Sequence, residues 1–465
     1  MKLNNFLKNL NINISDSVDI EINNITSDSR KCNMNSLYVN LHDEYLDDAV
    51  ERGVKAIVSD KYINYLDKIM IYVKDIKSLY YQALKKFYNI NNGYKIGVTG
   101  TCGKTTTVTL LYESLKLNRN NLLLISSNGN YIYINNQEEY YETKNTTPDI
   151  ETIYELINKF DYDYIIIEVS SQGLAKNRLE GILFDMCLFL NLSTDHLDYH
   201  KTISNYLNSK LKLFKQLKKD GICLINYHCK FKKLFDFSNH SCYTFGVGDG
   251  DYSIFYEKHD FEKTKIYFKD KYALTHLIGD YNAENISAAY AVINLLNINS
   301  DCLINCLNNG FKVKGRFEVI NYYSNKIIID FAHTEKEVEV LLNYVSNFSF
   351  NKRYIVIGCG GDRDKSKRSI FGKLAVQFAD EVIFTEDNSR GELVTDIISD
   401  MTINLNKKNF NIIINRYEAI KTSINLLKEN DILLIIGKGI DKSIINNRSL
   451  TDREIVEEVI YYDVK

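Results

Sequence analysis

The chain has 465 residues, of which 45% are apolar, and 57 Lys and Arg against 60 Asp and Glu give a formal net charge of −3. This nearly neutral balance excludes a dedicated nucleic-acid-binding protein, whose affinity would rest on a basic excess. No apolar run approaches the ~18 residues that a membrane span needs, and the N-terminus lacks the apolar core of a signal peptide. We therefore expect a cytoplasmic protein without a membrane partner, of about three domains at ~100–200 residues each.

The nine cysteines are scattered and include no Cys-x-x-Cys pair. An odd count in a long chain favours reduced thiols over a disulfide framework. Cys223, Cys229 and Cys242 with His228 and His240 have the residue types of a zinc site, but their spacing fits no standard one. We therefore expect no structural zinc.

Three stretches of different pattern follow one another along the chain. Residues 1–88 mix short strand-like runs with turn residues. From residue 94 onward short apolar runs alternate with helical stretches, and a second such series starts near residue 326. This alternation predicts an α/β fold with mainly parallel sheets, whose ligands bind at the C-terminal ends of the strands. The changes of pattern place the domains at 1–88, 89–316 and 317–465.

A glycine-rich segment, GVTGTCGKTTT at residues 97–107, follows an apolar strand and opens a helix. Its glycines allow successive backbone N–H groups to turn inward and bind an anion. Lys104 would then reach the β- and γ-phosphates of a nucleotide, and the Thr105 hydroxyl would hold Mg²⁺. The strict G-x-x-x-x-G-K-[ST] spacing fails because its first glycine would fall at Val98, so a turn without a ligand is the alternative. The order of strand, turn, Lys-Thr-Thr and helix favours nucleotide binding.

Further motifs follow in a fixed order. They are Asp28-Ser29-Arg30, Asn145-Thr146-Thr147-Pro148, Glu168-Val169-Ser170-Ser171, Asp195-His196-Leu197-Asp198-Tyr199-His200, Lys210-Leu211-Lys212-Leu213-Phe214, Gly315-Arg316-Phe317-Glu318, Asp330-Phe331-Ala332-His333-Thr334, Gly360-Gly361-Asp362-Arg363-Asp364 and Asp387-Asn388-Ser389-Arg390. With Gly100-Thr101-Cys102-Gly103-Lys104-Thr105-Thr106, this series resembles the Mur ligase family over nearly the whole chain. The resemblance implies an N-terminal domain for a uridine-diphosphate substrate (1–88), a central P-loop-type ATPase domain with a parallel sheet (89–316), and a C-terminal Rossmann-like domain for an amino acid (317–465).

The motifs are most similar to the family branch that adds the third residue of the peptidoglycan stem peptide. That branch implies ATP-dependent ligation of meso-diaminopimelate to the D-Glu carboxylate of UDP-N-acetylmuramoyl-L-alanyl-D-glutamate through an acyl phosphate, with Mg²⁺. Such a site must hold two anions close together and neutralise their charge, so it needs cations and hydrogen-bond donors more than a nucleophile. We expect the enzyme to be a monomer.

The resemblance also implies a role for each matching residue. For ATP these are Gly100, Thr101, Cys102, Gly103, Lys104, Thr105, Thr106, Asn285 and Arg316; for catalysis Lys104, Lys210, Asp330 and His333; for metal Thr105, Glu168, His196 and Lys210 as its Nζ-carbamate. For the UDP-muramoyl-dipeptide they are Ser29, Asn145, Thr146, Thr147, Ser170, Lys176 and Arg178. Residue type alone leaves other interpretations open: a structural histidine at 196, a solvated helix lysine at 210, and an ordinary turn before a helix at 145–147. A carbamate requires a lysine pKa lowered by burial.

The resemblance places the incoming amino acid at Arg363, Asp387, Asn388, Ser389, Arg390, Gly437 and Asp441. Arg390 favours diaminopimelate, because arginine pairs through two hydrogen bonds with the distal carboxylate that lysine lacks. Ser389 replaces the family's proline, and Ile440-Asp441 replaces a His-Glu pair. Gln172 also stands where a histidine usually follows Ser-Ser. The first two departures leave open a related ligase that uses L-lysine or another amine, and the third alters the surroundings of the metal site. Two further alternatives are a folylpolyglutamate synthetase, which the Asn-Thr-Thr-Pro run and Arg390 disfavour, and a non-catalytic nucleotide-binding relative. The retained polar residues Glu168, His196, Lys210, Asp330 and His333 argue against the latter.

Overall fold

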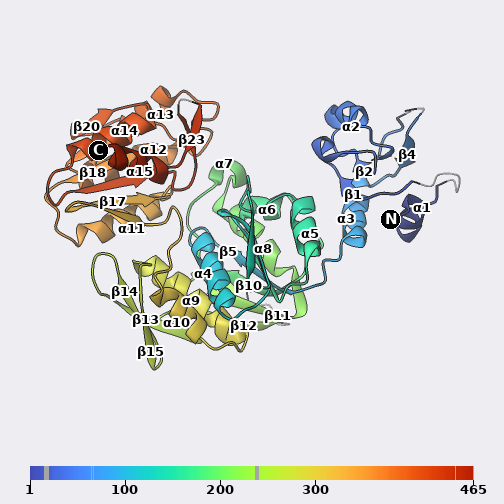
Figure 1. Cartoon of the computed structure of the whole chain (residues 1–465), viewed down its shortest axis with the longest axis horizontal. Helices are drawn as coiled ribbons and strands as arrows, with labels where there is room; N and C mark the ends of the chain where they lie inside the picture. Colours follow the sequence, from blue (N-terminus) through green and yellow to red (C-terminus); the bar gives the residue numbers. More distant parts are fainter. Residues whose placement is uncertain (15–19, 64, 66, 236–239, 446, 464–465) are drawn as a thin grey trace.

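The computed structural model describes residues 1–14, 20–63, 65, 67–235, 240–445 and 447–463. These residues form three units, each built around its own sheet, with the central unit between the other two (Figure 1). The N-terminal unit has a parallel four-stranded sheet of order β1-β2-β3-β4. Its elements are α1 (Leu3–Asn9), β1 (Asn24–Thr26), the 3-10 turn η1 (Ser29–Lys31), β2 (Ser36–Val39), η2 (Asp43–Tyr45), α2 (Leu46–Glu51), β3 (Ala56–Ser59), β4 (Ile69–Tyr72) and α3 (Ile76–Phe87).

The central unit has an eleven-stranded sheet of order β15-β14-β13-β12-β11-β10-β5-β9-β6-β7-β8. Its strands from β13 to β6 run parallel, and antiparallel strands extend both edges. The elements are β5 (Tyr94–Thr99), α4 (Lys104–Leu117), β6 (Leu122–Ser126), β7 (Gly129–Ile134), β8 (Gln137–Tyr141), α5 (Ile150–Lys159), β9 (Tyr164–Glu168), α6 (Ser171–Ala175), β10 (Phe184–Phe189), α7 (Leu197–His200), α8 (Ile203–Phe214), β11 (Leu217–Asn226), η3 (Lys232–Phe235), β12 (Ser241–Val247), β13 (Tyr252–Lys258), β14 (Thr264–Phe268), β15 (Lys271–Thr275), α9 (Asp280–Leu295) and α10 (Asp301–Asn308).

The C-terminal unit has a six-stranded sheet of order β16-β17-β21-β18-β19-β20, parallel except for the edge strand β16, and a small β22-β23 hairpin. Its elements are β16 (Glu318–Tyr322), β17 (Asn325–Asp330), α11 (Glu335–Ser346), β18 (Arg353–Ile357), α12 (Ser366–Phe378), β19 (Glu381–Phe384), α13 (Val394–Thr402), β20 (Phe410–Ile412), α14 (Arg416–Leu426), β21 (Ile432–Ile436), β22 (Ser443–Ile445), β23 (Arg448–Leu450) and α15 (Asp452–Asp463). The predicted α/β class with mainly parallel sheets is confirmed.

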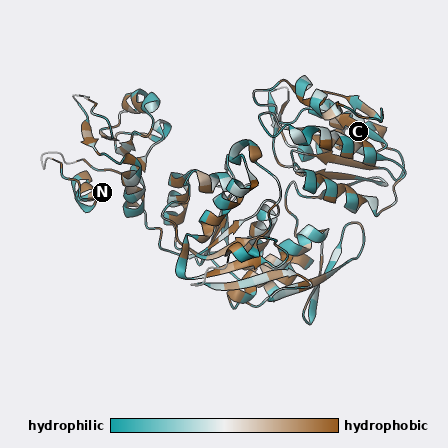
Figure 2. Cartoon of the chain, turned by 180° about the vertical axis from the view of Figure 1, so that it is seen from behind, coloured by the Kyte–Doolittle hydropathy of each residue, from teal (hydrophilic) through white to brown (hydrophobic). Residues whose placement is uncertain are grey.

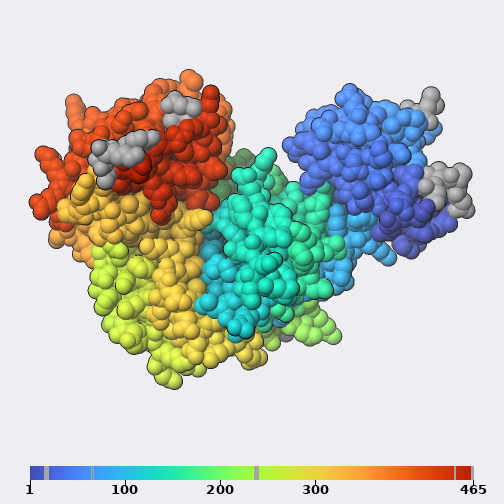
Figure 3. All heavy atoms as spheres, in the orientation of Figure 1, coloured from blue at the N-terminus to red at the C-terminus, as the bar shows by residue number. Residues whose placement is uncertain are grey.

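The strands are apolar on both faces because helices cover both faces of the parallel sheets (Figure 2). One apolar core runs from α1 and α3 of the N-terminal unit to one face of the central sheet. On helix α5, Ile150, Ile153, Tyr154 and Ile157 recur at helical spacing and are buried in that core. The N-terminal unit is therefore packed onto the central unit, although a notch separates their outer parts (Figure 3).

Among the described residues, none of the helices combines the length and the apolar character required to cross a lipid bilayer.

Candidate active site

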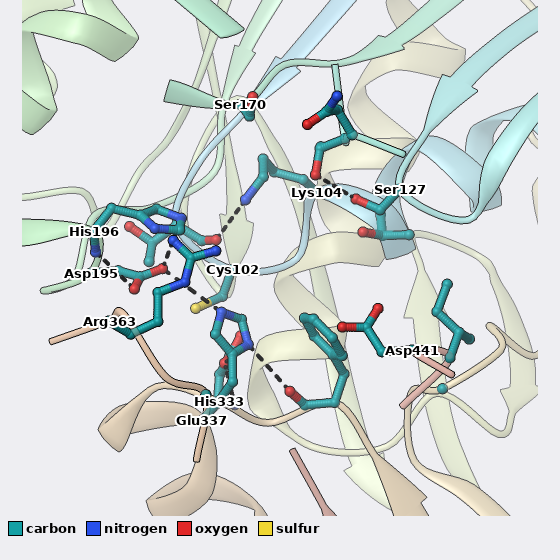
Figure 4. A pocket seen from close by; sticks show the side chains of 18 of the residues that line it. Cys102, Lys104, Ser127, Ser170, Asp195, His196, His333, Glu337, Arg363 and Asp441 are labelled. Carbon is teal, nitrogen blue, oxygen red and sulfur yellow. Dashed lines mark hydrogen bonds and ion pairs between the residues drawn. The ribbon is translucent and has the colours of Figure 1, made fainter. Parts of the chain in front are cut away.

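A cavity of about 350 Å³ lies where the central and C-terminal units meet (Figure 4). Strand β5 lies between β9 and β10, so the loops that follow these three parallel strands converge at one edge of the central sheet. In the C-terminal unit, the loops after β17, β18, β19 and β21 converge in the same way. The cavity is lined from both edges, so two sets of strand-end residues face each other across it.

The glycine-rich loop after β5 is held by Asn191, which follows β10. The Asn191 Oδ1 accepts hydrogen bonds from the backbone N–H groups of Thr101 (3.1 Å) and Cys102 (2.9 Å), and its Nδ2 donates to the Cys102 carbonyl (3.1 Å). Gly103 has a φ of +83°, and a Cβ at this position would lie 2.1 Å from the Asn285 Oδ1. Glycine is therefore required at the last position of the loop, and a neighbouring strand fixes the shape of the loop.

Two lysines approach the Gly100 carbonyl. Lys104 Nζ donates to the carbonyls of Gly100 (3.0 Å) and Thr101 (2.7 Å), and Lys210 Nζ donates to the Gly100 carbonyl (2.6 Å). Lys210 is 1% exposed and lies over the Tyr206 ring, 4.4 Å from its centroid. Burial, and then the charge of Lys104, lower the pKa of Lys210 well below its usual value. The interpretation of Lys210 as a solvated helix lysine is therefore wrong.

Glu168 ends β9 beside the start of α4. Its Oε1 accepts from the Thr105 hydroxyl at 3.0 Å, and its Oε2 accepts from the Ser127 backbone N–H at 2.9 Å. The Ser127 hydroxyl lies 3.1 Å from the Glu168 Oε1 and 2.9 Å from the Thr146 Oγ1. The structure thus joins a carboxylate and three hydroxyl groups, which are hard oxygen donors of the kind that Mg²⁺ prefers.

A row of imidazoles and carboxylates crosses from the central unit to the C-terminal unit (Figure 4). Asp195 Oδ2 lies 3.3 Å from His196 Nε2 and 3.9 Å from His333 Nε2, and the His333 Nδ1 lies 3.3 Å from Glu337 Oε2. Burial lowers the pKa of His196 to about 4, which keeps its imidazole neutral at neutral pH. Burial alone would raise the pKa of Glu337, but His333 and Arg316 outweigh it and lower that pKa to about 2. A charged carboxylate of the C-terminal unit therefore faces the phosphate loop.

Cys102, in the glycine-rich loop, contacts this carboxylate: its thiol hydrogen-bonds Glu337. Burial, and then the Glu337 charge, raise the pKa of Cys102 well above its usual range. The thiol is therefore protonated and acts as a donor between the two units rather than as a nucleophile.

Thr147 and Ser170 form a second polar group near the cavity. The Thr147 hydroxyl donates to the Glu168 carbonyl (2.9 Å), accepts from the Ser170 backbone N–H (2.9 Å), and lies 3.1 Å from the Ser170 hydroxyl. Arg178 Nη1 donates to the Thr147 carbonyl at 2.7 Å. The predicted helix after this run is confirmed, since Asp149 caps α5 by accepting from the Thr152 N–H at 3.0 Å.

In the C-terminal unit, a chain of polar groups links two strand-end loops. Lys438 Nζ donates to the Asn388 Oδ1 at 3.1 Å, and the Asn388 Nδ2 donates to the Asp441 Oδ2 at 3.0 Å. Burial, and then Asp387, raise the pKa of Asp441. The amide of Asn388 is therefore fixed in one orientation between a cation and an acid.

Arg390 lies against the loop that follows β18. Its Nη1 donates to the carbonyls of Gly361 (2.8 Å) and Asn388 (3.2 Å). A Cβ at Gly361 would lie 1.8 Å from the Ser389 carbonyl oxygen, so the two loops touch through their backbones. Arg363 of the C-terminal unit contacts the central unit, because its Nη1 lies 3.8 Å from the Asp198 Oδ2.

The cavity brings together most of the predicted site residues, though not all of them. Those that line it are Thr101, Cys102, Gly103, Lys104, Thr105, Asn145, Thr146, Glu168, Ser170, His196, Lys210, Arg316, His333, Arg363, Asp387, Asn388, Arg390, Gly437 and Asp441. The predicted residues that are not part of this lining are Gly100, Thr106, Thr147, Lys176, Arg178, Asn285, Asp330 and Ser389. Ser29 is buried in the N-terminal unit, where its side chain hydrogen-bonds Asp48.

Two of the residues outside the lining have defined partners. Asp330 accepts from the backbone N–H groups of Phe317 and Ala332, both at 2.7 Å, and so ties the end of β17 to the chain before β16. Asn285 Nδ2 donates to the Asn282 Oδ1 at 3.2 Å and packs against Gly103. The guanidinium of Arg316, in the lining, lies 4.5 Å from the centroid of the Phe331 ring.

Sequence reasoning assigned no role to Asn191, Ser127 or Glu337. Glu337 had a local signal, because Thr334-x-x-Glu337 has the spacing of a capping box, which the structure contains. Asn191 and Ser127 each follow an apolar strand, β10 and β6, but that position alone does not say which backbone group they meet.

Two family models match the chain: the Mur ligase middle domain at residues 98–293 and the Mur ligase, glutamate ligase domain, at residues 315–439. The UDP-N-acetylmuramoyl-L-alanyl-D-glutamate--2,6-diaminopimelate ligase of Parabacteroides distasonis is 35% identical over 450 residues, covering 90% of each chain. The ligase of the same name from Clostridioides difficile is 33% identical over 462 residues, covering 94% of each chain.

Solved structures of similar fold include a UDP-N-acetylmuramoyl-L-alanyl-D-glutamate--2,6-diaminopimelate ligase, at 24% identity, a TM-score of 0.64 and full coverage of both chains. A MurF ligase from Thermotoga maritima in complex with ADP has a TM-score of 0.66 at 17% identity and covers 97% of this chain and 99% of that one. The sequence relatives, the two domain matches and the shared fold agree, and the chain is an enzyme of the Mur ligase family.

Proposed function

We propose that this enzyme joins an amino group of meso-diaminopimelate to the D-Glu carboxylate of UDP-N-acetylmuramoyl-L-alanyl-D-glutamate, with ATP as the phosphoryl donor. The carboxylate oxygen attacks the γ-phosphorus and ADP leaves; the amine nitrogen then attacks the acyl carbon, loses a proton, and phosphate leaves. The observation that carries the proposal is that one cavity joins the Gly103-Lys104-Thr105 segment after β5 to the Asp387-Asn388 and Arg390 loop of the C-terminal unit.

The chain's own side chains supply the positive charges that balance the phosphate charges in this reaction. Lys104 and Arg316 line the cavity as cations for the polyphosphate and for the oxygen charge that develops during transfer. His333 reaches the same cavity from the C-terminal unit, so the site is complete only when the two units meet. Asn285 and Asp330 act from outside the lining, where they hold Gly103 and the β17 end in place.

The residues present fit Mg²⁺. The Thr105 hydroxyl and the Glu168 carboxylate are 3.0 Å apart and are hard oxygen ligands, and Mg²⁺ commonly takes one or two protein ligands with substrate phosphates and water. The low pKa of His196 leaves its ring nitrogen free of a proton for a second ion. When bound, the metal neutralises phosphate charge.

Lys210 meets the physical requirement for an Nζ-carbamate, because its buried amine has a strongly lowered pKa. Reaction of the neutral amine with CO₂ forms an N–C bond and releases a proton, which turns a cation into an anion. At its position beside the Gly100 carbonyl, that anion would help to hold the second metal.

The uridine-diphosphate substrate extends from the N-terminal unit to the cavity. Asn145, Thr146 and Ser170 would contact its muramoyl-dipeptide end, with Thr147, Lys176 and Arg178 close behind. Ser29 would mark the uridine end. We propose that the enzyme acts as a cytoplasmic monomer.

Arg390 decides the choice of diaminopimelate over L-lysine. Its Nη1 donates to two backbone carbonyls, so Nε and Nη2 would form the two-pronged pair with the distal carboxylate in the cavity. Asp441, one methylene shorter than the glutamate of the family pattern, is held by Asn388 near the same wall and would face the distal ammonium.

The test measures phosphate release from ATP by the purified enzyme with UDP-N-acetylmuramoyl-L-alanyl-D-glutamate, Mg²⁺ and each candidate amine. Turnover that requires diaminopimelate supports the proposal. Turnover with L-lysine or another amine instead would make the enzyme a ligase of different specificity, and the absence of ATP consumption with every amine would make it a non-catalytic relative.

A further inference from the structure

A buried carboxylate joins the N-terminal unit to the central unit away from the cavity. Glu151, in the first turn of α5, is only 2% exposed. Its Oε2 accepts from the Thr26 hydroxyl (2.8 Å), and its Oε1 accepts from the Ser27 backbone N–H and the Tyr80 hydroxyl (2.6 Å each). The Ser27 hydroxyl (3.0 Å) and Lys31 Nζ (3.4 Å) complete the set. All five donors belong to the N-terminal unit.

Four of the five donors come from the segment 26–31, which contains Ser29, the residue proposed for the uridine end of the substrate; the fifth, the Tyr80 hydroxyl, comes from α3. Within this segment, the Thr26 hydroxyl also accepts from the Asp28 backbone N–H at 3.0 Å. Asp28 in turn holds the Arg30 guanidinium through two hydrogen bonds of 2.8 and 2.7 Å. Residues 26–31 therefore form one connected turn, and Glu151 is its anchor in the central unit.

On the other side, Glu151 lies on the helix that starts directly after the segment 145–147. That segment lines or adjoins the cavity, and Asp149 caps the helix between the two. Backbone hydrogen bonds hold a helical turn in one geometry, so this turn is a rigid connection between the two segments. The loop at the uridine end and the segment at the dipeptide end are thus connected through a single helical turn.

The chemistry of this contact resists displacement of the N-terminal unit. A carboxylate in an apolar core is strongly destabilising unless its oxygens are hydrogen-bonded. Since the five described donors all lie in the N-terminal unit, any rotation of that unit away from α5 would break all of these hydrogen bonds together.

We propose that Glu151 is a positioning residue for the uridine-diphosphate substrate: through Thr26, Ser27 and Tyr80 it fixes the uridine loop at the correct distance from the dipeptide segment. This inference rests on the proposed function. A substrate held at both ends loses affinity when its two contact regions change their separation, whereas ATP and diaminopimelate bind between the other two units and do not depend on it.

The test compares steady-state constants of the full-length enzyme. Glu151→Ala is expected to raise KM for UDP-N-acetylmuramoyl-L-alanyl-D-glutamate at least tenfold, with kcat and the KM values for ATP and diaminopimelate within twofold of wild type. Glu151→Gln, which keeps one acceptor oxygen for Ser27 and Tyr80, is expected to show a smaller rise. Glu155→Ala is the matched control, because Glu155 lies one turn further along α5, is exposed, and has a long contact of 3.5 Å with the Tyr88 hydroxyl in place of the buried donors of Glu151.

An unchanged KM for the uridine substrate in a folded Glu151→Ala enzyme would overturn the inference. A parallel loss in all constants would also overturn it, because it would indicate a general structural role. If thermal unfolding shows no folded state for Glu151→Ala, the same KM values are measured for Glu151→Gln and Tyr80→Phe instead. The proposed function fails separately, when the wild-type enzyme itself shows no turnover.

Discussion

The buried ion pair between Arg416 and Asp452 gives a strong quantitative prediction. Both side chains are fully buried, and they are joined by hydrogen bonds of 2.7 Å (Nε to Oδ1) and 2.8 Å (Nη2 to Oδ2). Arg416 also donates to the carbonyls of Glu386 and Ile436, each at 3.2 Å. Arg416→Met would leave Asp452 as a buried charge without its partner, which lowers the free energy of unfolding by about 3–5 kcal/mol.

The assay is urea unfolding followed by tyrosine fluorescence, since the chain has 34 tyrosines and no tryptophan. The matched control is Arg448→Met in the same unit. Arg448 pairs with Glu458 at a similar distance of 2.7 Å, but its side chain is 59% exposed, so its loss should cost only about 0.2–1 kcal/mol.

The double variant Arg416→Met with Asp452→Met extends this comparison, because it removes both charges together. It should regain most of the stability that the single variant loses, since no charge is then left buried without a partner. Equal losses in Arg416→Met and Arg448→Met would refute the reasoning that burial sets the size of the effect.

Three further predictions concern the cavity. Lys210→Ala should abolish turnover, and millimolar short-chain carboxylic acid should restore part of it by replacing the carbamate anion; full activity without any additive would contradict the carbamate. Arg390→Lys should raise KM for diaminopimelate more than tenfold and leave KM for ATP unchanged, because lysine cannot form the two-pronged pair; constants equal to wild type would place the amino acid elsewhere. Glu337 has its pKa lowered to about 2, so it stabilises the fold above pH ~4.5 and this contribution is lost as the pH falls towards 2. Glu337→Gln should therefore flatten the fall in unfolding free energy below pH 4.5, measured by urea titrations at successive pH values, and an unaltered slope would count against the ion pairs of Glu337.

The sequence was sufficient for the features that depend on local pattern. Apolar runs became the buried strands β5, β9 and β10, and the segment 97–107 became a strand, a turn with Gly103 at positive φ, and a helix. Ordered motifs at strand ends became one cavity, because parallel strands bring their C-terminal ends to one edge.

Contacts between distant segments were not predictable in this way. Asn191 meets Thr101 and Cys102 from a different strand, and nothing near position 191 in the sequence identifies these partners. Glu151 resembles any acidic residue in the first turn of a helix until the N-terminal unit is placed over it. Burial of an isolated charge is a property of the assembled units, so residue type and spacing carry no direct signal of it.

The backbone contact between Gly361 and Ser389 gives these two positions opposite tolerance of mutation. Any side chain at 361 would collide with the Ser389 carbonyl oxygen, whereas residue 389 takes part through an atom that every amino acid has. Ser389, which replaces the proline that the resemblance implies at this position, is therefore compatible with an intact junction, in a chain that has one proline in all. A library of variants at the two sites should accept many residues at 389 and retain only glycine at 361.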